Sequence, residues 1–269
     1  MPALIRIEAT ADPRVEPYRA VRERDLVGRQ GLFVAEGEVV LRMLLAQHRH
    51  APVSLLLAEK RVSKLASLLE GLPDAVPVYV ASQAVMDEVA GFPIHRGVLA
   101  LARRAEPLDA GELLAGLAPP ALALGLIGIG NHDNMGGLLR NAAAFGAAAV
   151  VLDSGSCDPL YRKAIRVSVG AAVTTSFARL SPGEDMVDLF RAQGFEPLAL
   201  CPNGETPLSE LPRTDRAAVI VGSEGPGLPD AVLARCRRVS IPMARGWDSL
   251  NVGVAAALAL HHLKFVARC

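Results

Sequence analysis

From residue 121 to the C-terminus, short apolar runs alternate with longer segments of helical periodicity, and this alternation limits the fold more than any other feature. Runs of Val, Leu, Ile and Ala bounded by Gly, Pro or polar residues are typical of strands buried in a parallel sheet. The pattern predicts an α/β domain with an open, mainly parallel sheet and helices on both faces. The expected strands are residues 121–129, 148–152, 174–178, 197–200, 217–221 and 239–241. The expected helices are residues 135–145, 159–167, 185–192 and from 252 to about 266.

A shorter alternation occupies the first third of the chain. It predicts a smaller α/β unit over residues 1–104, a linker over 105–120 and the larger domain over 121–269. The expected elements of the smaller unit are a basic helix at 17–26 with arginines at 19, 22 and 24, strands at 31–37, 53–58, 76–80 and 98–102, and helices at 38–47, 62–70 and 83–89.

Composition excludes several classes of protein. The 28 Lys and Arg residues balance 28 Asp and Glu residues, and the aromatic content is only 4%, so the chain has neither bulk polycation character nor a stacking platform for single strands. No apolar run is long enough to cross a membrane, and the first residues lack a signal-peptide region. The cysteines are far apart without a CxxC pair, which argues against a zinc ribbon and fits a reduced, cytoplasmic protein. His48 and His50 are expected to be surface residues rather than metal ligands.

The first expected strand of the larger domain leads into a polar loop and a helix. The segment Gly128-Ile129-Gly130 begins like a dinucleotide fingerprint, but Asp133 stands where that fingerprint requires a glycine. Two further glycines permit close approach of the backbone, and Arg140 follows a turn and a half into the helix. From its position alone, Arg140 is best explained as a solvated or salt-bridged helix residue.

A glycine-rich loop follows the strand expected at 217–221. Three glycines and a proline surround one carboxylate, Glu224, and such a loop forms a narrow turn with free N–H groups. It lacks the Gly-Lys-Ser/Thr ending of a phosphate loop, and its carboxylate would repel a phosphate. Taken by itself, this loop sequence is typical of a simple tight turn.

The third loop follows the strand expected at 239–241, which must stop at Pro242 because proline has no N–H to donate. A turn around Gly246 follows, and then Ser249 and Asn251 supply oxygens suited to capping a helix N-terminus. Polar loops between strand ends and helix starts are where α/β folds bind ligands. A capped helix that only packs on the sheet would show the same pattern.

Three ordered motifs run through these loops. They comprise Asn134, Gly136, Arg140, Ala142, Phe145 and Gly146, then Gly222, Glu224 and Gly227, and finally Ile241, Pro242, Met243, Ser249, Leu250, Asn251 and Val252. This combination resembles the SpoU/TrmH-type family of RNA ribose methyltransferases in the SPOUT superfamily, over residues 121–269. A smaller shared piece comprises Ser168, Gly170 and Ala171, and Glu36-Gly37 with residues 97–100 more weakly resemble the family's N-terminal substrate-binding domain.

The resemblance implies an S-adenosylmethionine-dependent enzyme that methylates a ribose 2′-hydroxyl in tRNA or rRNA. It also implies a C-terminal trefoil knot that holds the cofactor, and a homodimer whose active sites are completed across the interface of the knot domains. The implied cofactor-binding residues are Gly222, Ser223, Ile241, Met243 and Leu250. The implied catalytic residues are Arg140, Asn134, Glu224, Ser249 and Asn251. The family gives the proton-accepting role to Arg140, but a guanidinium is ordinarily protonated, so the safer hypothesis is that Arg140 orients the ribose and its phosphate.

Two loop edges depart from the family pattern. Family members often carry Asp-Pro where this chain has Asn131-His132, and Arg245 stands one place before Gly246, where the family has its glycine. These departures bear on RNA selection and loop shape. One alternative is a non-catalytic RNA-binding protein on a retained knot scaffold, although a scaffold has no need of the full catalytic set. Another is a nucleotide-dependent oxidoreductase, which the missing glycine fingerprint argues against.

Overall fold

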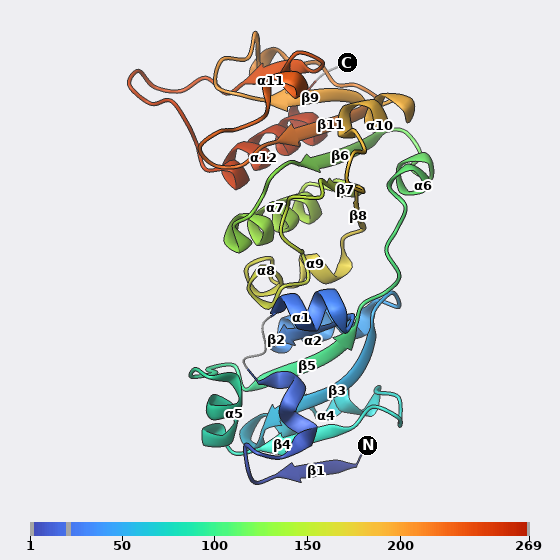
Figure 1. Cartoon of the computed structure of the whole chain (residues 1–269), viewed down its shortest axis with the longest axis vertical. Helices are drawn as coiled ribbons and strands as arrows, with labels where there is room; N and C mark the ends of the chain where they lie inside the picture. Colours follow the sequence, from blue (N-terminus) through green and yellow to red (C-terminus); the bar gives the residue numbers. More distant parts are fainter. Residues whose placement is uncertain (1–2, 20–22, 268–269) are drawn as a thin grey trace. The chain divides into compact units, whose positions relative to one another are not determined.

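The computed structural model describes residues 3–19 and 23–267, which divide into two compact units (Figure 1). The first unit runs to Glu106 and also includes Leu160–Thr174, and the second comprises Pro107–Pro159 and the chain from Thr175 onward. The domain limits expected from the sequence stay a prediction. The contacts add one feature that the sequence did not indicate, because they group residues 160–174 with the N-terminal unit.

The first unit is a mixed sheet with helices. Its strands are β1 (Leu4–Ile7), β2 (Leu32–Glu36), β3 (Ala51–Ala58), β4 (Val78–Ala81) and β5 (Val98–Arg103). Its helices are α1 (Glu23–Arg29), α2 (Glu38–Ala46), α3 (Glu59–Val62), α4 (Ala66–Glu70), α5 (Gln83–Ala90), α8 (Arg162–Val167) and α9 (Ala171–Thr174), with 3₁₀ turns at Pro13–Tyr18 and Ser63–Leu65. The strand order is β1-β4-β3-β5-β2, in which β5 runs antiparallel to β3 and β2.

The second unit has the architecture that the alternation predicts. Its strands are β6 (Ala121–Leu126), β7 (Ala149–Leu152), β8 (Phe177–Arg179), β9 (Glu196–Leu200), β10 (Thr206–Pro207), β11 (Arg216–Val221) and β12 (Arg237–Ser240). Its helices are α6 (Ala110–Ala115), α7 (His132–Ala144), α10 (Met186–Ala192), α11 (Asp230–Leu233) and α12 (Val252–His261), with a 3₁₀ turn at Leu208–Glu210 and a π-helical turn at His262–Val266. The described strands all run parallel, in the order β10-β12-β9-β11-β6-β7-β8.

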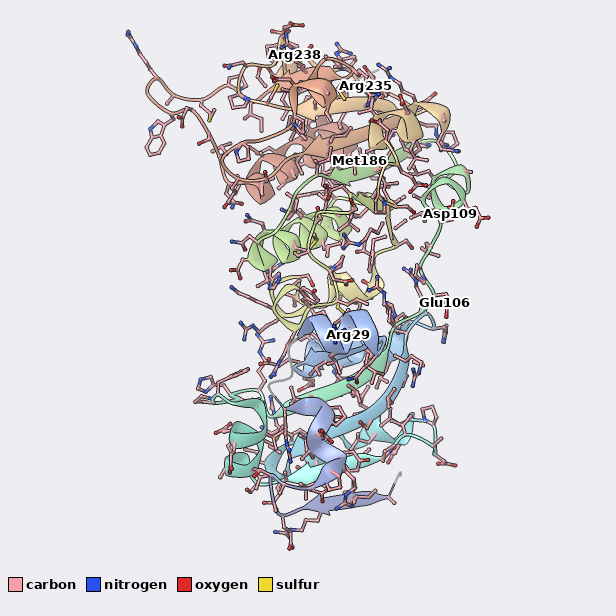
Figure 2. All side chains as sticks on the ribbon, viewed as in Figure 1. Arg29, Glu106, Asp109, Met186, Arg235 and Arg238 are labelled. Atoms are coloured by element: carbon pink, nitrogen blue, oxygen red, sulfur yellow. The ribbon has the colours of Figure 1, made fainter. Side chains whose placement is uncertain are left out.

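Both faces of this parallel sheet are covered. On one face, α6 and α10 bury their apolar side chains against the sheet; Met186 of α10 packs over Gly125 of β6 so closely that a Cβ there would lie 2.7 Å from its sulfur (Figure 2). On the other face, α7 and α12 lie side by side and contact β7 and β11 (Figure 1). Burial on both faces explains why the strands read as continuous apolar runs. The predicted fold class is confirmed.

Several expected boundaries are wrong in the first unit. The basic helix expected at 17–26 is absent as a single element, because Pro17 lies inside a 3₁₀ turn and Arg19 has extended backbone (φ −62°, ψ 166°) before α1 begins. Buried Tyr18, whose hydroxyl lies 2.6 Å from Ser54 Oγ, fixes this turn to the core. Arg22 lies outside the described residues, and so does the side chain of Arg24. The helix expected at 62–70 is divided, because Leu65 leaves helical geometry at φ −103°, ψ 5°.

His50 is not a surface residue. It is 3% exposed, its ring packs edge-on against Phe33, and its Nδ1 accepts a hydrogen bond from the Ala105 N–H at 3.1 Å. The pKa of His50 is lowered to about 4. Burial is the largest cause, and the positive charges of Arg49 and Arg104 are the next. The apolar strand that follows it along the chain explains why this histidine is carried into the interior.

In the second unit, the short elements β10 and α11 were not expected, and the other errors lie at element ends. The strand expected at 121–129 ends at Leu126, and the helix after it begins at His132 because Asn131 caps it. The strand expected at 174–178 begins only at Phe177, because α9 extends to Thr174 and two irregular residues follow it. Within the described ranges, no helix is long and apolar enough to span a membrane.

Candidate active site

The candidate site lies at the carboxyl edge of the parallel sheet of the second unit. Strands β7 and β8 lie on one side of β6, and strands β11 and β9 lie on its other side. The direction in which successive strands are added to the sheet therefore reverses between β6 and β11. Such a switch point leaves a crevice at the strand ends. A cavity of about 740 Å³ opens beside it, and the loops after β9, β11 and β12 line it.

The loop after β11 is a tight hairpin. Gly227 N–H donates to Ser223 O at 3.1 Å, and Gly225 and Gly227 have left-handed φ angles of 88° and 69°. A Cβ on Gly222 would lie 2.4 Å from the carbonyl carbon of Gly227, so only glycine fits there. The hairpin presents Glu224 at its exposed tip, and Glu224 is one of the residues that line the cavity.

The loop after β12 is long and exposed. Ile241, Met243, Ser249 and Leu250 line the cavity, and Ser249 Oγ donates to Asp248 Oδ1 at 3.1 Å. The loop turns where Trp247 N–H donates to Ala244 O at 3.2 Å. The loop therefore supplies one wall of the cavity.

Asn251 joins the three loops. Its Oδ1 caps α12 by accepting from Gly253 N at 2.9 Å and Val254 N at 3.3 Å. Its Nδ2 donates to Asn134 Oδ1 at 2.9 Å and to Glu224 Oε1 at 3.1 Å. The helix cap thus fixes the amide so that its two donors reach the first turn of α7 and the hairpin after β11.

The first loop is supported by residues that sequence reasoning missed. Asp153 Oδ2 accepts from Gly128 N at 3.0 Å, and Ser156 Oγ accepts from Ile129 N at 3.0 Å. Arg179 holds this support in place, since its guanidinium donates to the carbonyl oxygens of Asp153 and Ser156 at 2.8 and 2.7 Å. A signal was present, because Asp153 directly follows an apolar strand just as the residues of the recognised loops do.

Arg140 stands apart from the other predicted residues. It is exposed on α7 and is not one of the residues that line the cavity, and within the described residues it has no hydrogen-bond or ion-pair partner. Gly222 and Ser223 do line the cavity, as do Ile241, Met243 and Leu250. The structure thus brings together all predicted site residues except Arg140.

The lining combines apolar walls with a few charged groups. Most of the lining residues belong to the loops after β9, β11 and β12, and Val221, Val239, Val252 and Ala255 add apolar side chains from the flanking strands and α12. Glu224 and Asp230 contribute carboxylates, and Arg238 is paired with Glu205. Burial raises the pKa of the Cys201 thiol, which therefore stays protonated at neutral pH. Among the described residues, no group of three or more His, Cys, Asp or Glu side chains could hold a metal.

Comparison with known proteins agrees with this geometry. The model of the SpoU rRNA methylase family matches residues 121–261. A protein of Mycobacterium bovis named as an uncharacterized tRNA/rRNA methyltransferase is 40% identical over 261 residues, which cover 93% of this chain and 88% of the relative.

Two solved structures share the fold. One described as an RNA 2′-O ribose methyltransferase is 28% identical, with a TM-score of 0.80, and covers 96% of this chain and 98% of its own. The AdoMet-bound rRNA methyltransferase from Sinorhizobium meliloti has a TM-score of 0.81 and covers 96% of both chains. Its identity is 20%, so this second likeness concerns the fold alone.

Proposed function

Because this chain belongs to the SpoU rRNA methylase family and is an S-adenosylmethionine-dependent RNA methyltransferase, we propose that its acceptor is a ribose 2′-hydroxyl in tRNA or rRNA. One observation carries the assignment of the site. Asn251 donates to both Asn134 and Glu224 beside the cavity, so residues from three separate segments meet at one point: the first turn of α7, the hairpin after β11 and the N-cap of α12. Such convergence is expected of a site that must hold two substrates in a fixed orientation.

The cavity suits S-adenosylmethionine. Its volume of about 740 Å³ lies in the range of small-molecule sites, and its apolar walls with a few polar groups suit an adenosine attached to a charged amino acid. In this proposal, Gly222, Ile241 and Leu250 hold the adenine and ribose, with Ser223 and Met243 beside them. The carboxylate of Glu224 gives the cavity mouth a negative charge that favours a cationic ligand. When bound, the cofactor supplies an electrophilic methyl group.

The chain must also prepare the acceptor. A ribose hydroxyl is a weak nucleophile until its proton is removed. We assign to Arg140 the orientation of the ribose and its adjacent phosphate, for which a planar, protonated guanidinium is well suited, and the hydroxyl proton is released to solvent as the methyl group is transferred. Asn134, Ser249 and Asn251 position the substrate.

A homodimer through the knot domain would complete the site. Arg140 is not a cavity residue of its own chain, and α12 exposes Val254 and Leu258 (49% and 43%) along a groove that it forms with α7. Apolar side chains in such a groove suit an interface between copies. In the dimer, Arg140 of one protomer would serve the cavity of its partner. The same proposal includes a trefoil knot in the second unit.

Methyl-labelled S-adenosylmethionine tests the reaction. The purified protein is incubated with fractionated tRNA and rRNA, which are then digested to nucleosides. Label in a 2′-O-methyl nucleoside is the expected result, and the labelled fraction identifies the RNA class. Label on a base would leave the family assignment intact but reject the ribose as acceptor.

Arg140→Ala tests the catalytic assignment. Turnover should fall by about 100-fold or more, as when an oriented transition-state donor is lost, while cofactor affinity stays unchanged in calorimetry. Arg213→Ala, at another exposed arginine of the same unit, is the control and should retain activity. Full activity of Arg140→Ala would remove this residue from the mechanism.

Mixing impaired variants tests the shared site. Under the proposal, Arg140→Ala and Asn251→Ala homodimers each lose at least about tenfold in turnover. If a site takes Arg140 from one protomer and Asn251 from the other, each mixed dimer contains one intact site. Co-refolding or co-expression should then restore activity, whereas a site built within one chain gives no rescue.

A further inference from the structure

The first unit carries an exposed loop with an unusual surface. Residues 91–97, between α5 and β5, place Phe92, His95 and Arg96 at exposed positions, and Phe92 is 40% exposed. We call this segment the Phe92 loop. A single exposed apolar side chain is common and carries no meaning by itself. What distinguishes this loop is how firmly it is held and which groups surround it.

The Phe92 loop is fixed from beneath by side chains of α5. Asp87 Oδ1 accepts from Ile94 N at 2.7 Å, while Gln83 Nε2 donates to Asp87 Oδ1 and to Ile94 O, both at 2.8 Å. Ile94 itself is 1% exposed, and Ala58 N donates to Gly97 O at 3.0 Å. The loop is therefore built into the unit, and its outward side chains are presented in a preorganised arrangement.

Three arginines from separate segments converge on this loop. The Arg162 guanidinium lies 4.7 Å from the centroid of the Phe92 ring and is held by Glu36 at 3.0 Å. Arg96 lies over Gly37, where a Cβ would approach its Cδ to 2.9 Å. Arg61 Nε donates to Arg96 O at 2.7 Å. An aromatic ring stacked with a guanidinium, with further arginines beside it, is suited to a planar base and its phosphates.

The local charge is positive on the outside. The carboxylate of Glu36 is buried and paired with Arg162, and Asp87 is occupied by the amide groups of Ile94 and Gln83. These hydrogen bonds, with the nearby charges of His95 and Lys60, lower the pKa of Asp87. Both carboxylates are thus engaged, and the exposed guanidinium of Arg96 is free to meet solvent beside them, which favours a phosphate-bearing partner.

We propose that the Phe92 loop, together with Arg61 and Arg162, grips an unpaired nucleotide of the RNA substrate. One base stacks on Phe92, and the flanking phosphates pair with Arg61 and Arg96. Unpaired bases in RNA loops are the ones that a protein is able to stack on an aromatic ring. This inference rests on the proposed function, since it concerns the RNA on which the enzyme acts. The proposal needs only one exposed ring, so it is compatible with the low aromatic content of the chain.

The test measures binding of the RNA fraction that accepts methyl label, by anisotropy of a fluorescent RNA, together with kcat and KM for that RNA. Phe92→Ala should weaken RNA binding about 5- to 100-fold and raise KM, with kcat at saturating RNA unchanged. Phe92→Trp keeps a stacking ring and should bind like the wild type. Phe92→Leu keeps the apolar bulk without the ring, so it should lose binding as Phe92→Ala does. Leu4→Ala removes a similarly exposed apolar side chain of β1 (45% exposed) and is the control.

Salt dependence tests the arginine contacts. Arg96→Ala should weaken binding and reduce the slope of log K against log salt by about 0.7, the value for one phosphate of a single strand. The inference is overturned if Phe92→Ala and Phe92→Leu bind RNA like the wild type, as they would if the loop served a protein partner. It is also overturned if Phe92→Leu retains full affinity while Phe92→Ala unfolds. Failure of the proposed function gives a different result, in which wild-type protein binds RNA without forming any 2′-O-methyl nucleoside.

Discussion

The two units keep their polar side chains in different places. Within the described ranges, the first unit buries Glu36, His50, Ser54 and Ser168, whereas the second buries only Ser156. In the second unit, three candidate site residues, Asn134, Glu224 and Asn251, lie at the carboxyl ends of the strands and bond to one another. A buried polar group must be satisfied inside the protein, while an exposed one is able to exchange water for a ligand. We therefore expect substitutions of the first group to change stability, and those of the second to change function.

The largest expected effect comes from the buried ion pair of the first unit. Glu36→Ala would leave Arg162, whose side chain is 14% exposed, without its carboxylate. Removing one partner of such a pair costs about 3–5 kcal/mol of unfolding free energy. Calorimetry of the full chain should show a transition shifted to lower temperature. Glu38→Ala breaks the exposed pair with Arg42 and should cost no more than about 0.5 kcal/mol. Equal effects of the two substitutions would contradict the comparison.

His50 gives the first unit a pH-dependent stability. Because burial lowers the pKa of His50 from 6.5 to about 4, the unfolded chain binds its proton at higher pH than the folded one. The contribution is fully present above pH 6.5 and is lost as pH falls toward 4, by about 3 kcal/mol.

The measurement is denaturant unfolding of the wild type and of His50→Gln across this pH window. Glutamine retains an acceptor for the Ala105 N–H, so the variant should fold while lacking the titration. The difference between the two proteins should therefore depend on pH. Parallel curves for both would show that His50 does not titrate in the way its burial implies.

Gly222→Ala tests how closely the hairpin after β11 is packed, and whether that hairpin holds the cofactor as proposed. Gly222→Ala forces a Cβ to within 2.4 Å of the Gly227 backbone, so the hairpin must open. We expect a loss of about 1–3 kcal/mol in stability and at least about tenfold in affinity for S-adenosylmethionine. Gly130→Ala is the matched control, because its Cβ meets nothing within 4 Å and its φ is not left-handed. Unchanged cofactor affinity in Gly222→Ala would exclude this hairpin from the cofactor site.

Sequence reasoning predicted the second unit better than the first, and the reason is physical. A parallel strand that is buried on both faces is mostly apolar. The strands β6, β7, β9 and β11 were therefore recognisable from their runs of apolar residues. Short edge strands such as β1 bury few side chains, and β1 was missed. The docking of residues 160–174 on the first unit depends on contacts far apart in sequence, which no local pattern encodes.

The site shows the same division between local and non-local information. The helix cap at Asn251 was predictable from the sequence, because capping depends only on residues next to the helix start. The hydrogen bonds from Asn251 to Asn134 and Glu224 were not predictable from local sequence patterns, because the bonded residues are 117 and 27 positions apart. Only the family resemblance put these residues together. The support by Asp153 and Arg179 lay outside the motifs and was missed.

Asn251 allows stability and function to be separated at a single position. Asn251→Ala removes the helix cap and the two donors, so it should cost about 1 kcal/mol of stability and about tenfold or more in kcat. Asn251→Ser retains a capping oxygen but has no amide, so stability should return while activity stays low. Unfolding and methyl-transfer assays on both variants give the comparison. If Asn251→Ser recovers activity along with stability, the bridge to Asn134 and Glu224 is dispensable, and the cap alone accounts for this residue.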